Sequence, residues 1–224
     1  MADDTVDHDE IYELPMFPLG SVLLPGMLLP LHVFEPRYRV LVDTVLLSDR
    51  REFGVVLIER GSEVGGGEAR TGIGCAARVL DLSRADDGRV ALAAVGVRRI
   101  RVDHWLEDDP FPRAVVTDWP DEPLTPGPPA RRELSAAVAS ARGRLDRLAE
   151  LMVQLGHAEE VAIPELSDDL GECSYQIATL SPLGALDRQR VLATTEIAAR
   201  LALLDELLAD QEILLRAELD RPEG

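Results

Sequence analysis

Five prolines interrupt an almost wholly apolar segment near the start of the chain, LPMFPLGSVLLPGMLLPLHVFEPRY, which runs from Leu14 to Tyr38. They exclude both one long helix and one uninterrupted strand, because proline lacks a backbone N–H and clashes with the preceding helical turn. Proline is tolerated at strand starts, edges and bulges, so the segment predicts short strands joined by tight corners, as in a small barrel. Glu35 and Pro36 then suit the start of a helix.

The first half of the chain continues as strands. The run EFGVVLIE (Glu52 to Glu59) is apolar on both faces, which is typical of a strand buried on both sides. The segment Arg99 to Leu106 alternates instead, which predicts His104 on an apolar face. An Asp-Gly pair at Asp87 and Gly88 indicates a hairpin. The opposite, wetter face of the alternating strand is predicted to carry Arg99, Arg101, Asp103 and Trp105.

The second half differs in composition and pattern. Trp119 to Glu133 holds five prolines and a glycine, which is typical of a linker. Apolar residues at helical spacing then predict helices at about 134–155, 170–180 and 197–208, packed on one another or, alternatively, in a coiled coil with a second chain. We therefore expect a disordered acidic tail at 1–10, a β-rich domain at 11–121, a Pro-rich linker at 122–130 and a helical subdomain at 131–224.

Charge narrows the possible partners. The chain has 224 residues and a formal net charge of -18, so its average surface repels phosphate backbones and anionic lipid. The first ten residues are acidic where a secretory signal would be basic, and the proline-broken segment after them is no membrane span. We therefore expect a cytoplasmic protein for which nucleic acid and membranes are poor partners.

Catalytic motifs are weak or absent in the sequence. It contains no lysine, which excludes a Walker P-loop, a Schiff-base lysine and a Ser-Lys dyad. GIGCAA (Gly72 to Ala77) matches a dinucleotide fingerprint, but a strand rather than a helix follows it, and the glycines at 65–67 fit a flexible loop. Cys75 and Cys173 fit small core residues, and no histidine pair has metal-ligand spacing. We predict no catalytic residue, no cofactor and no metal.

Four segments in order carry a family resemblance. They are Glu13 to Val42, which contains the FEPRY box, then EFGVVLIE, then TGIGCAARVLDL (Thr71 to Leu82), then VGVRRIRV (Val95 to Val102). The chain resembles the N-terminal, substrate-binding domain of Lon proteases in its free-standing bacterial form, and cereblon contains a related module. The resemblance implies an α+β fold, with a PUA-like β pseudo-barrel followed by an α-helical bundle. Lon proteases carry ATPase and peptidase modules after this domain, so we expect no protein degradation by this chain alone.

The resemblance implies a non-enzymatic module that binds unfolded or exposed apolar polypeptide, as an adaptor or chaperone-like binder in protein quality control that could serve a separate protease. An RNA-binding module is the alternative, because PUA-like barrels elsewhere bind RNA and because Arg98, Arg99 and Arg101 cluster on one strand. A small-molecule hydrolase is a third hypothesis, but it lacks a nucleophile-base pair. The candidate binding residues are Phe34, Arg37 and Tyr38 in the FEPRY box, with Trp105 on the wetter strand face.

Overall fold

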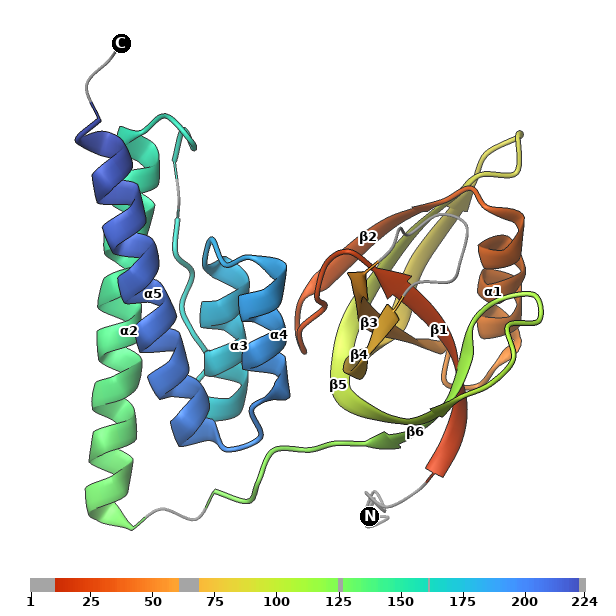
Figure 1. Cartoon of the computed structure of the whole chain (residues 1–224), viewed down its shortest axis with the longest axis horizontal. Helices are drawn as coiled ribbons and strands as arrows, with labels where there is room; N and C mark the ends of the chain where they lie inside the picture. Colours follow the sequence, from red (N-terminus) through yellow and green to blue (C-terminus); the bar gives the residue numbers. More distant parts are fainter. Residues whose placement is uncertain (1–10, 61–68, 125–126, 161, 222–224) are drawn as a thin grey trace. The chain divides into compact units, whose positions relative to one another are not determined.

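The computed structural model describes residues 11–60, 69–124, 127–160 and 162–221. Its contacts divide the chain into two compact units, 1–120 and 121–224, which Figure 1 shows with their helices and strands. The tail expected at 1–10 and the glycine loop at 65–67 lie outside the described residues. The domain limits expected from the sequence stay a prediction, which a proteolysis experiment below tests.

In its described residues, the first unit is a coiled sheet with one helix. The elements are β1 (Ile11–Leu19), β2 (Leu28–Val33), α1 (Pro36–Leu47), β3 (Glu52–Arg60), β4 (Ala69–Arg84), β5 (Val90–Trp105) and β6 (Arg113–Asp118). Its strand order is β2-β5-β4-β3-β1-β6, and β5 also pairs with β6, so that the sheet closes on itself and leaves β2 at an edge. Neighbouring strands are antiparallel except for the parallel pair β1 and β3. The closed sheet followed by helices confirms the predicted α+β fold.

A proline corner leads into β2, as the sequence predicts. Pro25 and Gly26 form the centre of a turn in which the Met27 N–H donates to the Leu24 carbonyl at 3.0 Å, and Gly26 takes a φ of +79° that glycine adopts without steric cost. The Gly26 N–H donates to the Gly96 carbonyl at 2.8 Å, and the Gly96 N–H donates to the Met27 carbonyl at 3.0 Å. This two-against-one pairing is a β-bulge, and it fixes the register in which β2 joins β5.

Two apolar clusters lie on opposite faces of the sheet. One contains Tyr38 and Leu41 of α1 together with Leu92 and Ala94 of β5, so α1 packs on that face of the sheet. The other fills the barrel that β6 closes, and it is made of Leu14, Met16, Val56, Ala76, Ile100, Ala114 and Val116. The face of β5 that bears Ala91 and Ala93 therefore points away from α1.

The described residues of the second unit form four helices: α2 (Pro128–Gln154), α3 (Leu170–Leu180), α4 (Ala185–Ala193) and α5 (Ile197–Leu219). The long helices α2 and α5 lie side by side (Figure 1). Helix α4 is not predicted from the sequence, because its polar residues show no clear apolar stripe at helical spacing. The helix expected at about 134–155 begins earlier in the structure, at Pro128.

A fully buried arginine anchors the start of the second unit. Arg200 of α5 is 0% exposed, and its guanidinium donates to both carboxylate oxygens of Asp121 at 2.7 and 2.6 Å. It also donates to the Ser174 hydroxyl at 2.8 Å and the Tyr175 hydroxyl at 3.0 Å. A buried guanidinium requires such partners, so these bonds tie the segment at Asp121 to α3 and α5.

Among the described helices, none is both long and apolar enough to cross a membrane.

Candidate functional site

The structure separates the three candidate residues of the FEPRY box. Phe34 directly follows β2 and is 54% exposed. Tyr38 is buried in α1 and stacks on Phe17, with 4.1 Å between ring centroids and 12° between ring planes. Arg37 lies over the Tyr38 ring at 4.6 Å, and its Nε donates to the Glu35 carboxylate at 3.2 Å. Phe34 is therefore available to a partner, whereas Tyr38 is a core residue that holds α1 on the sheet.

The predicted wetter face of the strand Arg99 to Leu106 was wrong for two residues. Arg99 is buried, and its Nε donates to the Trp119 carbonyl at 3.0 Å. A register shift between Val102 and His104 changes the alternation, so Trp105 is partly buried against the cluster inside the barrel, while His104 is exposed. Trp105 lies at the far end of β5 from the strand segment beside Phe34. It does not join Phe34 in one site.

Phe34 belongs to a largely apolar surface that spans three strands and also carries the exposed Asp81 and Ser83 of β4. Along β2, Pro30 lies opposite Ala93 of β5, and Ala93 lies opposite Asp81 of β4. One step further, His32 lies opposite Ala91. A bulge between Val79 and Asp81 turns Leu80 outward beside this row. We call this surface the outer patch and define it as Leu28, Pro30, His32, Phe34, Leu80, Ala91 and Ala93.

The outer patch exposes large apolar side chains. Leu28 is 65% exposed, Leu80 is 56% exposed and Phe34 is 54% exposed. Ala91 and Ala93 lie between them, and because their side chains end at Cβ the surface is shallow there. Beside the patch lies a hollow of about 510 Å³, lined by His32, Val33, Phe34, Ser83, Ala85, Arg89, Val90 and Ala91. This hollow is mostly apolar, and its arginine is already paired with Asp87 at 2.7 Å.

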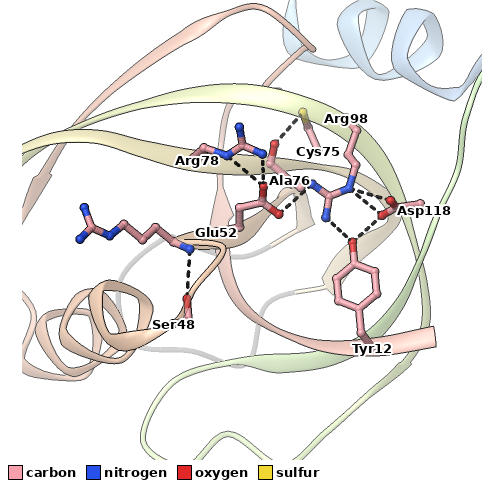
Figure 2. Close-up of polar contacts among 9 residues, drawn as sticks. Tyr12, Ser48, Glu52, Cys75, Ala76, Arg78, Arg98 and Asp118 are labelled. Atoms are coloured by element: carbon pink, nitrogen blue, oxygen red, sulfur yellow. Dashed lines mark hydrogen bonds and ion pairs between the residues drawn. The ribbon is translucent and has the colours of Figure 1, made fainter. Parts of the chain in front are cut away.

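Of the three arginines that suggested RNA binding, Arg98 and Arg99 bond to groups within the first unit, and Arg101 is exposed and lies 3.5 Å from the Asp103 carboxylate. Figure 2 shows Arg98 between two carboxylates, with its Nε donating to Asp118 at 2.8 Å and its Nη1 donating to Glu52 at 2.7 Å. Arg98 also donates to the Tyr12 hydroxyl at 2.7 Å, and that hydroxyl donates to Asp118. Arg78 completes the set by donating to Glu52 at 2.8 Å. These interactions connect β1, β3, β4, β5 and β6, so they stabilise closure of the barrel.

Titration properties agree with this structural role. Burial and the hydrogen bond with Asp118 raise the pKa of Tyr12. Burial alone would lower the pKa of Arg98, but the hydrogen bonds that Arg98 donates to Asp118 and Glu52 outweigh it, so the pKa is raised. Both groups therefore keep their protons across the physiological pH range, and Arg98 stays charged and bound to its carboxylates.

The two cysteines are buried, as predicted. Burial raises the pKa of the Cys75 thiol to about 12, and it also raises the pKa of the Cys173 thiol. A neutral thiol is a poor nucleophile, so neither side chain resembles a catalytic cysteine. Across the described ranges, no group of three or more His, Cys, Asp or Glu side chains is arranged to hold a metal ion.

Comparison with known families decides what kind of domain this is. A family model described as the ATP-dependent protease La (LON) substrate-binding domain matches residues 13–210, which cover both units. The chain belongs to this family. The match confirms the Lon resemblance that the FEPRY box and the later strand motifs suggested.

Solved structures and curated relatives agree with the Lon substrate-binding family. The chain is similar to a Lon N-terminal domain protein from Xanthomonas campestris, with 29% identity, a TM-score of 0.61, and coverage of 88% of this chain and 98% of that chain. The N-terminal domain of Mycobacterium avium complex Lon protease shares the fold, with 20% identity, a TM-score of 0.62, and coverage of 89% of this chain and 99% of that chain.

Two curated Lon proteases match across most of the chain. Lon protease of Desulfosudis oleivorans is 24% identical over 91% of this chain and 24% of its own length. Lon protease 1 of Herpetosiphon aurantiacus is 28% identical, again over 91% of this chain and 24% of its own length. The chain thus spans about a quarter of the length of the curated relatives it matches.

Sequence reasoning found one member of the outer patch of this Lon-type domain, Phe34, and missed the others. Leu28 and Pro30 alternate with residues that are also apolar, so the strand shows no polar face that would mark its outward side. The bulge that exposes Leu80 has no sequence signal of its own. One available signal was Pro30, because proline inside a strand indicates a sheet edge.

Proposed function

We propose that this protein is a non-catalytic polypeptide-binding module that takes exposed apolar segments of unfolded proteins on the outer patch. One observation carries the proposal. A domain of the Lon substrate-binding family, in a chain of net charge -18, exposes Leu28, Phe34 and Leu80 together on one sheet face. Large apolar side chains grouped on one face of a protein that is otherwise highly charged are typical of an interaction site.

The patch suits weak, broad binding. Burial of apolar surface contributes roughly 25 cal/mol per Å², and the small side chains of Ala91 and Ala93 allow many different segments to approach. An unfolded partner loses conformational freedom on binding, which offsets part of this gain. We therefore expect a Kd of about 1 μM, or about -8 kcal/mol.

We place this activity in protein quality control in the cytoplasm. The relatives are named as Lon proteases, and the family model that matches this chain is named for their substrate-binding domain. A chain with that region can act as an adaptor or a chaperone-like binder that presents clients to a separate protease. The RNA-binding alternative has less support, because Arg98 is bonded to Asp118 and Glu52, and because the buried Arg99 donates to the Trp119 carbonyl.

The proposal is tested by titrating a labelled, permanently unfolded protein of near-zero net charge into the full chain. We expect saturable binding that falls about ten-fold in Phe34→Ala and further in Phe34→Ala combined with Leu80→Ala. Leu47→Ala is the matched control, because Leu47 is 89% exposed but lies at the end of α1, which packs on the other sheet face. Equal losses in the control and the patch variants would reject the outer patch as the binding site.

A further inference from the structure

The strand β2 has one edge paired with β5, and within the described part of the chain no strand pairs with its other edge. An unpaired strand edge presents backbone donors and acceptors that another extended chain can use. Native proteins cover or interrupt such edges, and Pro30 interrupts this one. The edge lies directly beside the outer patch, which contains Pro30, His32 and Phe34.

The hydrogen bonds between β2 and β5 determine which main-chain groups of β2 point toward its free edge. The Gly96 N–H donates to the Met27 carbonyl at 3.0 Å, and bonded positions alternate along an antiparallel pair. Every second residue from Leu29 to Val33 therefore bonds to β5, whereas the main-chain groups of Pro30 and His32 point away from it. Proline suits this position, because its missing N–H would point away from β5 and so removes no hydrogen bond of the sheet.

Two hollows flank the end of β2. The hollow of about 510 Å³ lies toward the hairpin between β4 and β5. A second groove of about 200 Å³ lies along the free edge, where Phe17 and Leu19 of β1 and Tyr38 of α1 line it. Phe34 lines both. Successive side chains of a strand point to opposite faces, so an added strand would direct its side chains alternately to the outer patch and to the groove.

Charge complementarity favours an uncharged occupant. The charges nearest to the two hollows are already paired within the chain, with Arg89 on Asp87 at 2.7 Å and Arg37 on Glu35 at 3.2 Å. A charged side chain entering either hollow would lose hydration without gaining a counter-charge, which is costly.

We propose that the partner binds as an added β-strand along the free edge of β2, and that the bound segment is extended and uncharged, with apolar side chains at alternate positions. This inference rests on the proposed function and specifies how the same site recognises its partner. The carbonyl of Pro30 and both main-chain groups of His32 form the hydrogen bonds, while Phe34 separates the pockets for alternate side chains. Because Pro30 has no backbone N–H to donate, the added strand forms few hydrogen bonds with β2 and binds weakly.

The test uses the full chain and a fluorescein-labelled short peptide of alternating valine and threonine. Pro30→Val adds one outward N–H, and we expect the peptide to bind about two- to ten-fold more tightly, which is the net effect of one hydrogen bond. His32→Pro removes an outward N–H, and we expect weaker binding by a similar factor. Thermal unfolding checks that both variants are folded, and size-exclusion chromatography checks that Pro30→Val has the same oligomeric state as the wild type.

Two further peptides test the pairing without altering the protein. Each is N-methylated at every second residue, in opposite phases, and we expect one to lose at least about ten-fold in affinity while the other binds almost normally. A lysine at the centre of the unmethylated peptide is expected to weaken binding as well. If the unfolded protein binds and Phe34→Ala weakens it, but Pro30→Val and both methylated peptides behave like their parents, strand addition is overturned and the proposed function stands. Absence of any binding to the unfolded protein would overturn the proposed function itself.

Discussion

The FEPRY box offers a direct comparison of two aromatic residues that the sequence treats alike. Replacing Tyr38 with alanine removes a ring that is 3% exposed and stacks on Phe17 at 4.1 Å. Truncating a buried aromatic residue to alanine costs about 3–5 kcal/mol, of which the ring pair accounts for about 0.5–1.5 kcal/mol. Replacing Phe34, which is 54% exposed, is expected to change stability by no more than about 0.5 kcal/mol.

The assay measures thermal unfolding and client binding for the same variants. For a chain of this size each 1 kcal/mol shifts Tm by about 2–4 °C, so Tyr38→Ala is expected to lower Tm by about 10 °C. Tyr38→Phe is the matched control, because it keeps the stacked ring. Phe34→Ala is expected to leave Tm within about 2 °C and to weaken binding of unfolded protein about ten-fold. The reasoning is refuted if Phe34→Ala lowers Tm as much as Tyr38→Ala, or if Tyr38→Ala leaves Tm unchanged.

Three further predictions concern stability and domain organisation. Trp105→Ala is expected to lower the free energy of unfolding in urea by about 2 kcal/mol, because Trp105 packs against the barrel interior and its ring lies 4.4 Å from the Arg70 guanidinium. An unchanged urea midpoint would contradict this and would support the exposed position of Trp105 that the sequence predicts. Burial raises the pKa of Cys75 to about 12 from an ordinary 9.0, so the buried neutral thiol favours the folded state below pH 9, and this contribution to stability is lost as pH rises toward 12. Cys75→Ala is therefore expected to lose less stability than the wild type between pH 8 and pH 10.5. Parallel curves of unfolding free energy against pH for the two proteins would contradict this. Limited trypsin is expected to cut first at Arg131 or Arg132, which are exposed at the start of α2; a first cut within Val95 to Val102 would contradict the predicted domain limits.

Much of the fold could be predicted from the sequence because local signals agree with the tertiary structure. The prolines and glycines of Leu14 to Tyr38 mark corners that the chain does form, such as the turn at Pro25 and Gly26. Pro36 at the first turn and the apolar spacing after it define α1. The long apolar repeats likewise identify α2 and α5. In each case the local preference and the packing require the same conformation.

The candidate site was harder to predict, because it depends on strand register. A one-residue bulge moves all later side chains to the opposite face, and the bulges at Leu80 and after Val102 leave no mark in the sequence. Phe34 and Tyr38 are both aromatic and four residues apart, but only their positions before and within α1 show which one is exposed. Arg99 is similar, because its partner is a distant backbone carbonyl, that of Trp119.

One fluorescence titration tests the central claim most directly. Labelled unfolded protein of near-zero net charge and a labelled single-stranded RNA are each titrated with wild type and with Phe34→Ala, at low and at high salt. We predict a Kd of about 1 μM for the unfolded protein, little change with salt, and about ten-fold weaker binding by Phe34→Ala. Three phosphate contacts would instead give a slope of about -2 for log affinity against log salt. Tight RNA binding with that slope, together with no affinity for the unfolded protein, would contradict the polypeptide-binding account.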